Sequence, residues 1–165
     1  MKSEEIVHVF MENAAKVTAK PTRVTNIDNL NETLEKILVG EKAIYCQGTT
    51  ELEKLLKIDP ERRVDSYWNA TATVEEVVCG IAETGSVIVT SDGGRAVQAS
   101  LLPAHHVAMV SAENIFPTMD DFFAGIGDNP PTNITLITGP SRTADIELTL
   151  TIGVHGPEKV SILVI

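Results

Sequence analysis

Hydrophobic side chains follow two periods along the chain, and the first third follows the period of a helix. In the segment 3–20, apolar residues recur every three or four positions up to Pro21, which is typical of an amphipathic helix that ends before a proline. A second stripe of this kind is followed by Gly40 and predicts a helix over about 29–39. We therefore expect an N-terminal helical segment over about 1–40.

The remaining chain alternates between short apolar runs and further helical patterns. The runs are typical of buried strands and lie at 43–46, 86–90, 106–110, 133–138 and 159–165. Helices are expected at about 49–56, 73–79 and 112–124, and Thr73 with Glu76 fits a capping box at the start of the second of these. This order predicts a single three-layer α/β domain over 1–165, with a largely parallel sheet.

The segment 145–152 supports two interpretations. Polar and apolar residues alternate there without interruption, which indicates a strand. If the strands at 133–138 and 159–165 are parallel neighbours, however, the chain between them must cross over the sheet, and such crossovers are usually helical. We expect a helix.

The charge of the chain excludes several classes of partner. Thirteen Lys and Arg residues stand against 23 Asp and Glu, which gives a net charge of −10. Because no basic run offsets this charge, we do not expect the chain to bind nucleic acid or anionic membranes. No run approaches the roughly 20 apolar residues of a membrane span, and residues 1–6 lack the pattern of a signal peptide. A cytoplasmic location is expected.

Cysteine and histidine residues are few and poorly placed for metal binding. Cys46 and Cys79 lie 33 positions apart, whereas an iron–sulfur cluster needs about four ligands. His105 and His106 are adjacent, so on a strand they point to opposite faces and cannot form a simple pair of metal ligands. The sequence therefore predicts no metal site and no cofactor.

The segment 138–145 is the strongest candidate for chemistry. If a helix begins there, its free N–H groups and the hydroxyls of Ser141 and Thr143 would converge beside Gly139, and Arg142 would add a charged contact. Such a site would bind a phosphate or a carboxylate. Alternatively, Ser141 or Thr143 only caps the helix and Arg142 pairs with a surface carboxylate.

Three other segments carry residues of the same kinds. Thr84, Gly85 and Ser86 precede a strand and either donate to a ligand or form a tight turn. Arg95 follows two glycines at the end of that strand, where an anion could bind. His155 lies in a turn at 154–157 and could transfer protons near neutral pH.

Four blocks of this sequence resemble one family. The blocks are 83–86, Arg95 with 100–103 and His105, 139–147, and 153–157, and they resemble the lactate-utilisation protein C (LUD-domain) family over about 70–165. The resemblance implies a Rossmann-like fold similar to that of sugar-phosphate isomerases, CoA transferases and 5-formyltetrahydrofolate cyclo-ligase. It also favours a helix over 145–152.

The resemblance implies a role in oxidising L-lactate to pyruvate beside partner proteins that carry iron–sulfur clusters. This chain would be the component without a cluster, and it would bind a small anionic ligand or organise its partners. Alternatively, it is a stand-alone enzyme acting on a phosphorylated, nucleotide-linked or CoA-linked small acid. The candidate ligand contacts are Thr84, Gly85, Ser86, Arg95, Gly139, Ser141, Arg142, Thr143 and Gly156. Candidates for acid–base roles are Glu83, Asp145, Glu147 and His155.

Overall fold

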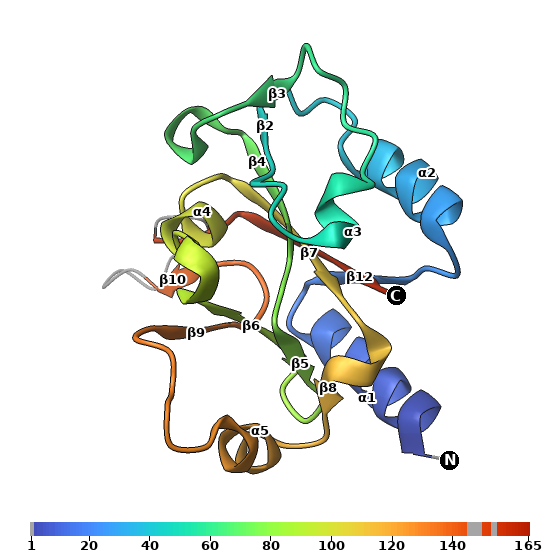
Figure 1. The fold of residues 1–165 in the computed structure, drawn as a ribbon, viewed down its shortest axis with the longest axis vertical. Coiled ribbons are helices and arrows are strands. Elements are labelled where there is room, and N and C mark those ends of the chain that lie inside the picture. Colours follow the sequence, from blue (N-terminus) through green and yellow to red (C-terminus); the bar gives the residue numbers. More distant parts are fainter. Residues whose placement is uncertain (1, 145–149, 153–154) are drawn as a thin grey trace.

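A parallel sheet forms the centre of the molecule (Figure 1). The computed structural model describes residues 2–144, 150–152 and 155–165. Six strands pair in the order β1-β12-β7-β4-β2-β3, and all neighbours run parallel. Their bounds are β1 Lys20–Arg23, β12 Lys159–Val164, β7 His105–Val110, β4 Ala72–Glu76, β2 Ile44–Tyr45 and β3 Arg63–Val64.

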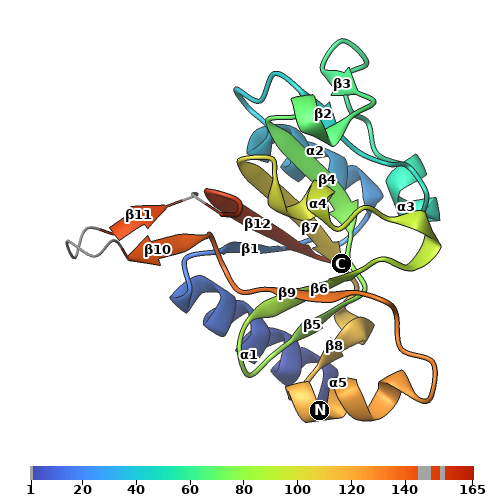
Figure 2. The ribbon, with the colours of Figure 1, turned by 90° about the vertical axis from the view of Figure 1, so that its left-hand side faces the viewer.

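A second sheet packs beside the first (Figure 2). It has the order β8-β5-β6-β9, where β6 is antiparallel to both of its neighbours and β5 is parallel to β8. The strands are β5 Cys79–Ile81, β6 Ser86–Thr90, β8 Ile115–Phe116 and β9 Ile134–Ile137. The chain passes directly from β4 into β5, because the N–H of Val77 still donates to Met109 of the first sheet while that of Val78 donates to Ile88 of the second.

Helices cover both faces of the parallel sheet, as the three-layer prediction requires. On one face, Leu30, Leu34 and Leu38, on α2 or at its end, pack against strand residues such as Val74 and Met109. The other face is covered by α1 and by β6 and β9 of the second sheet, whose far side is covered by α5. The helices are α1 Lys2–Lys16, α2 Ile27–Ile37, α3 Glu51–Lys54, α4 Gln98–Leu101 and α5 Met119–Ile126, with 3-10 turns at Tyr67–Asn69, Asp92–Gly94 and Ala112–Asn114.

The N-terminal pattern and most of the strand runs are confirmed, with changes in detail. The first helix ends at Lys16, and Pro21 lies within β1 on the edge of the sheet, where its missing N–H costs no ladder bond. The run 86–90 is a strand, but it is antiparallel to its neighbours rather than part of the parallel sheet. Only the later part of 112–124 is α-helical.

The predicted helix over 73–79 is wrong. This segment is the central strand β4 and the start of β5, and Thr73 and Glu76 form no capping box. The capping-box spacing of Thr73 and Glu76 misled the prediction, and Glu75 and Glu76 place two carboxylates in the segment. The structure buries Glu75 beside His106 and Arg95, so the strand tolerates it.

The helix expected over 145–152 is also wrong where the structure describes it. Arg142–Ala144 form β10 and Leu150–Ile152 form β11, and the two strands pair antiparallel. The argument for a crossover failed because β9 belongs to the second sheet and not to the parallel sheet of β12. Residues 145–149 lie outside the described residues. Figure 2 shows β10 and β11 at one side of the molecule.

Candidate functional site

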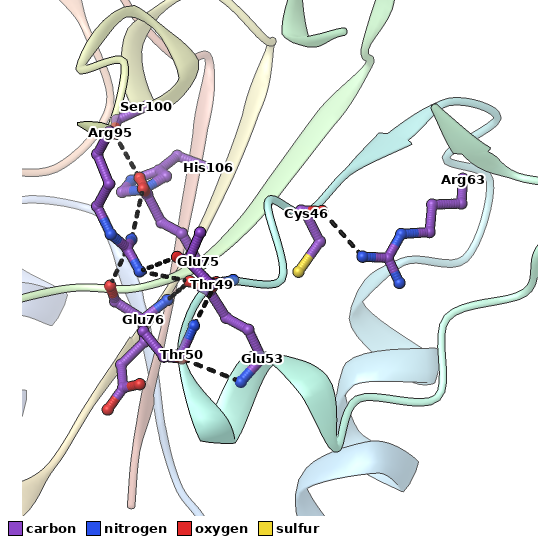
Figure 3. Close-up of polar contacts among 10 residues, drawn as sticks. All are labelled: Cys46, Thr49, Thr50, Glu53, Arg63, Glu75, Glu76, Arg95, Ser100 and His106. Carbon is purple, nitrogen blue, oxygen red and sulfur yellow. Dashed lines mark hydrogen bonds and ion pairs between the residues drawn. The ribbon is translucent and has the colours of Figure 1, made fainter. Parts of the chain in front are cut away.

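A buried polar cluster lies at the carboxyl ends of β2 and β4 (Figure 3). At its centre, Arg95 Nη2 lies 2.9 Å from Glu53 Oε1, and Arg95 Nη1 lies 3.5 Å from Glu75 Oε2. The Arg95 side chain is 16% exposed and the Glu53 side chain 0%. We call Arg95, Glu53, Glu75, Ser100 and His106 the Arg95 cluster. Ligands of open α/β sheets usually bind at this edge.

Glu53 is held by the loop that follows β2. Thr50 and Glu53 form a capping box at the start of α3, with Thr50 Oγ1 accepting from the Glu53 N–H at 3.1 Å. The Glu53 carboxylate accepts from the N–H groups of Thr49 and Glu76, each at 2.9 Å. Burial acts to raise the pKa of Glu53, but these N–H donors and Arg95 outweigh it and hold the pKa below its usual value of 4.5.

Glu75 is the second carboxylate of the cluster, and it pairs with a histidine. His106 Nε2 donates to Glu75 Oε1 at 2.8 Å, and the Ser100 hydroxyl donates to the same oxygen. His106 is fully buried, and its Nδ1 atom has no hydrogen-bond partner among the described residues. Burial acts to raise the pKa of Glu75, but His106, Ser100 and Arg95 hold it below 4.5.

The guanidinium of Arg95 uses both of its terminal nitrogens. Nη1 donates to the Glu76 carbonyl at 2.9 Å, and Nη2 donates to Thr49 Oγ1 at 3.2 Å. The contact with Glu75 is the longest that Arg95 makes. A small carboxylate that replaced this contact would accept a charge-assisted hydrogen bond from Arg95 Nη1. The Glu75–His106 pair would then lie beside the ligand and could exchange a proton with it.

Cys46 lies close to the Arg95 cluster but is not activated by it. Its carbonyl accepts from Arg63 Nη2 at 3.0 Å (Figure 3). Burial, followed by the nearby Glu53 carboxylate, raises the pKa of the Cys46 thiol to about 11. The thiol is therefore protonated at neutral pH and is a poor nucleophile or metal ligand.

The predicted glycine- and hydroxyl-rich segments come together, but they pack against the chain itself. Ser86 Oγ bonds the hydroxyls of both Thr84 and Thr138 at 2.7 Å. Gly85 and Gly139 both have positive φ angles, and a Cβ on either would lie 2.1 Å from the backbone near the end of α1. These glycines are required for close packing against α1. For 84–86, this packing agrees with the tight turn that is the alternative to a ligand site there.

Two charged residues of the predicted site likewise bond neighbouring segments. Glu83 Oε1 accepts from the Met119 N–H at 2.7 Å and so caps the start of α5. Arg142 Nη2 donates to Thr18 Oγ1 at 2.6 Å. Because Arg142 lies in β10 and not in a first helical turn, the helix N-terminus that the predicted anion site required is absent there.

The remaining predicted residues lie around β10 and after β11. The Ser141 N–H donates to the Pro157 carbonyl at 2.8 Å, and a Cβ on Gly156 would lie 3.1 Å from Ser141 Cβ. Thr143 is part of β10, and His155 is exposed. Asp145 and Glu147 lie outside the described residues. Their acid–base roles stay predictions, as do the ligand contacts of the other residues.

Sequence reasoning identified Arg95 but missed its partners. Ser100 belongs to one of the blocks that carry the family resemblance, yet no role was assigned to it. Two signals could have pointed to the carboxylates: Thr50 with Glu53 is a capping box that does form, and Glu75 interrupts a buried apolar strand. A charge in such a strand is rarely buried without a partner.

The fold and the Arg95 cluster define an α/β protein with a charged site at the carboxyl edge of a parallel sheet. The family model of the LUD domain matches residues 65–165, and the chain belongs to this family. "Lactate utilization protein C" of Geobacillus sp. (strain WCH70) is 35% identical over 98% of this chain and 78% of that protein. The protein of the same name from Macrococcus caseolyticus is 31% identical over 86% of this chain and 70% of its own length.

A solved structure supports the fold. The crystal structure of a DUF162 family protein from Deinococcus radiodurans matches with a TM-score of 0.73 over 99% of this chain and 98% of that one, at 20% sequence identity. Over the described ranges, no helix is long and apolar enough to cross a membrane. In the same ranges, no three His, Cys, Asp or Glu side chains are grouped so that they could hold a metal ion.

Proposed function

We propose that this chain is the component of an L-lactate utilisation system that carries no iron–sulfur cluster of its own. The observation that carries the proposal is its similarity to proteins named lactate utilization protein C over most of its length. Its two cysteines are too few for a cluster that needs about four ligands. The electrons that leave lactate would therefore pass to iron–sulfur partner proteins.

The Arg95 cluster is where a small carboxylate would bind in this proposal. A carboxylate ligand would take the place of Glu75 Oε2 at Arg95 Nη1, the longest contact of the guanidinium. Glu75 would keep its hydrogen bonds to Ser100 and His106, so its carboxylate would not be left without donors. Thr49 Oγ1, already bonded to Arg95, would lie near the hydroxyl or keto oxygen of the ligand.

Ligand binding tests the site. We expect saturating L-lactate to raise the unfolding temperature of the full chain, since a ligand at 100 times its Kd adds about 2.7 kcal/mol of stability. Arg95→Lys keeps the charge between Glu53 and Glu75, but one ammonium group cannot hold Glu53, Thr49 and the Glu76 carbonyl and still donate to the ligand, so L-lactate should bind about tenfold more weakly. Arg23→Lys, on an exposed residue paired with Glu4, is the matched control. Equal affinity in both variants would place the ligand elsewhere.

Association with partners tests the assignment to a lactate system. The tagged full chain, purified from its native host grown on L-lactate, should carry iron–sulfur proteins with it, detected by iron content and visible absorbance. A host grown without lactate and a host expressing the tag alone are the controls. If no iron–sulfur protein associates under either growth condition, the proposed role is wrong, whatever the ligand assay shows.

A further inference from the structure

A second polar site lies at the opposite edge of the parallel sheet, where its strands begin. His105, the first residue of β7, bonds Glu41 Oε1 through Nδ1 at 3.0 Å and Ser161 Oγ through Nε2 at 2.9 Å. A carboxylate oxygen can only accept, so Nδ1 donates to Glu41. Nε2 of the neutral ring therefore accepts, and the Ser161 hydroxyl donates to it. The Ser161 oxygen keeps its lone pairs for another donor.

Two of these side chains, His105 and Ser161, are buried and form the floor of a cavity. Its volume is about 260 Å³, and it is lined by Lys20, Lys36, Ile37, His105, Lys159 and Ser161. Lys20 and Lys159 begin the neighbouring strands β1 and β12, and Lys36 lies in the last turn of α2. The walls are therefore cationic, and the floor offers a hydroxyl oxygen.

Charge favours an anion in this cavity. Lys36 pairs with Glu32 at 2.6 Å, and Lys159 lies 4.0 Å from Glu41. Three ammonium groups then face two carboxylates, which leaves one positive charge in a chain whose net charge is −10. Burial lowers the pKa of His105, partly offset by Glu41, so the ring adds no charge at neutral pH. A single negative charge would neutralise the site.

We propose that this cavity binds a small oxyanion that carries its own hydroxyl group, such as hydrogen phosphate or a 2-hydroxycarboxylate. The lysines hold the negative oxygens, and the ligand's O–H donates to Ser161 Oγ. An oxyanion without a proton would set its oxygen lone pairs against those of Ser161, which costs affinity. This inference does not depend on the proposed function.

Binding fits the geometry better than acyl transfer does. A hydroxyl, an imidazole and a carboxylate in this order can also activate a nucleophile. That chemistry needs donors for an oxyanion, but the N–H groups of Glu158 and Lys159 both donate to the Ala104 carbonyl. Ser161 itself is only 3% exposed and lies within β12. The serine therefore acts as a fixed acceptor, positioned by His105.

Calorimetric titration of the full chain at neutral pH and constant ionic strength tests the proposal. The probes are inorganic phosphate against sulfate, and L-lactate against pyruvate, because each pair differs in the presence of the hydroxyl. We expect at least one hydroxyl-bearing probe to bind in a saturable manner and about tenfold more tightly than its counterpart. Which pair shows the preference distinguishes a phosphate from a carboxylate ligand.

Variants separate this site from the Arg95 cluster. Lys36→Gln combined with Lys159→Gln should weaken the preferred probe about tenfold or more, since two charged contacts are lost. Lys16→Gln, which changes a last-turn lysine of α1, should leave its affinity within about twofold. Ser161→Ala should remove the preference for the hydroxyl while charge still attracts the anion. Arg95→Lys should leave binding at this cavity unchanged, whereas it weakens a ligand of the other site.

Three results would overturn the proposal. They are the absence of saturable binding for both phosphate and L-lactate, equal affinity for the members of each pair, and unchanged affinity in the double lysine variant. The double variant alters exposed side chains, so it keeps the test valid even if Ser161→Ala does not fold.

Discussion

Two adjacent histidines of β7 bind the same kinds of partner in different surroundings. His105 bonds Glu41 and Ser161 on the face that α2 covers, whereas His106 bonds Glu75 on the other face, beside Ser100. His106 lies in a buried cluster whose carboxylates are paired with Arg95. His105 lies at the floor of a cavity lined by lysines. The alternation of a strand therefore gives neighbouring residues separate environments.

The two clusters also differ in how their charge is compensated. Glu75 shares one guanidinium with Glu53, and both carboxylates are almost completely removed from water. Among the described residues, Glu41 meets only the neutral ring of His105 and a lysine at 4.0 Å, although its side chain, 11% exposed, is nearly as buried as that of Glu75 at 9%. Removing a charge should therefore cost far more in the first cluster than in the second.

Among these substitutions, Arg95→Ala should cause the largest loss of stability. It leaves two buried carboxylates without their cation, and breaking a buried ion pair in this way costs about 3–5 kcal/mol. Urea unfolding at pH 7, followed by circular dichroism, measures the loss. Lys159→Ala is the counterpart in the other cluster; its 64% exposed side chain should make little difference to stability.

Acid should reduce this difference between Arg95→Ala and the unsubstituted chain. The folded-state pKa values of Glu53 and Glu75 lie below 4.5, so both groups stabilise the fold above that pH and lose this contribution as the pH falls. The two proteins should therefore converge in stability below about pH 4.5, where the carboxylates take up protons. A gap that stayed constant down to pH 3 would show that Arg95 acts through packing rather than charge.

A matched pair of carboxylate substitutions should show an intermediate effect. In Glu75→Gln, the amide must turn its N–H group toward other donors, either Arg95 or His106 and Ser100. The free energy of unfolding should therefore fall by about 2–3 kcal/mol. In Glu41→Gln, the amide oxygen can still accept from His105 Nδ1, so the free energy of unfolding should fall by about 1 kcal/mol or less. Both are measured by urea unfolding. Equal losses would mean that the two histidine sites are energetically alike.

The sequence predicted three of the six strands of the parallel sheet, β2, β7 and β12, because these strands are short, apolar runs. It failed at β4, where the partners of Glu75 come from β7, from α4 and from the loop after β6. None of these contacts has a local signal, since they join residues 20–31 positions apart. The same holds for Glu53 and Arg95, which lie 42 positions apart. Buried charge pairs are visible only once the topology is known.

The candidate site was predicted only in part for a related reason. Gly85 and Gly139 carry positive φ angles and flank hydroxyl residues, which is also the pattern of an anion-binding loop. The close approach of α1 accounts for both glycines, and only the tertiary packing shows this. Arg95 was identified because a strand end is a generic ligand position. Its partners Glu53 and Glu75 were not.

The smallest effect, and the sharpest test of the comparison, concerns the position of one proton on each ring. His105 donates from Nδ1 to Glu41, so Nε2 of its neutral ring is unprotonated, whereas His106 donates to Glu75 from Nε2. Long-range ¹H–¹⁵N correlation spectra near neutral pH should therefore show a proton on Nδ1 of His105 and on Nε2 of His106, with His105→Gln and His106→Gln providing the assignments. On acidification, burial, partly offset by Glu41, keeps the pKa of His105 below its usual 6.5, so its ring should stay neutral at a pH where an exposed histidine is protonated. Since the unfolded chain then binds a proton that the folded chain does not, this ring costs stability as the pH falls below about 6.5. If His105 carried its proton on Nε2 instead, that nitrogen would donate to Ser161, and Ser161 would no longer be the fixed acceptor that distinguishes the lysine-lined cavity from the Arg95 cluster.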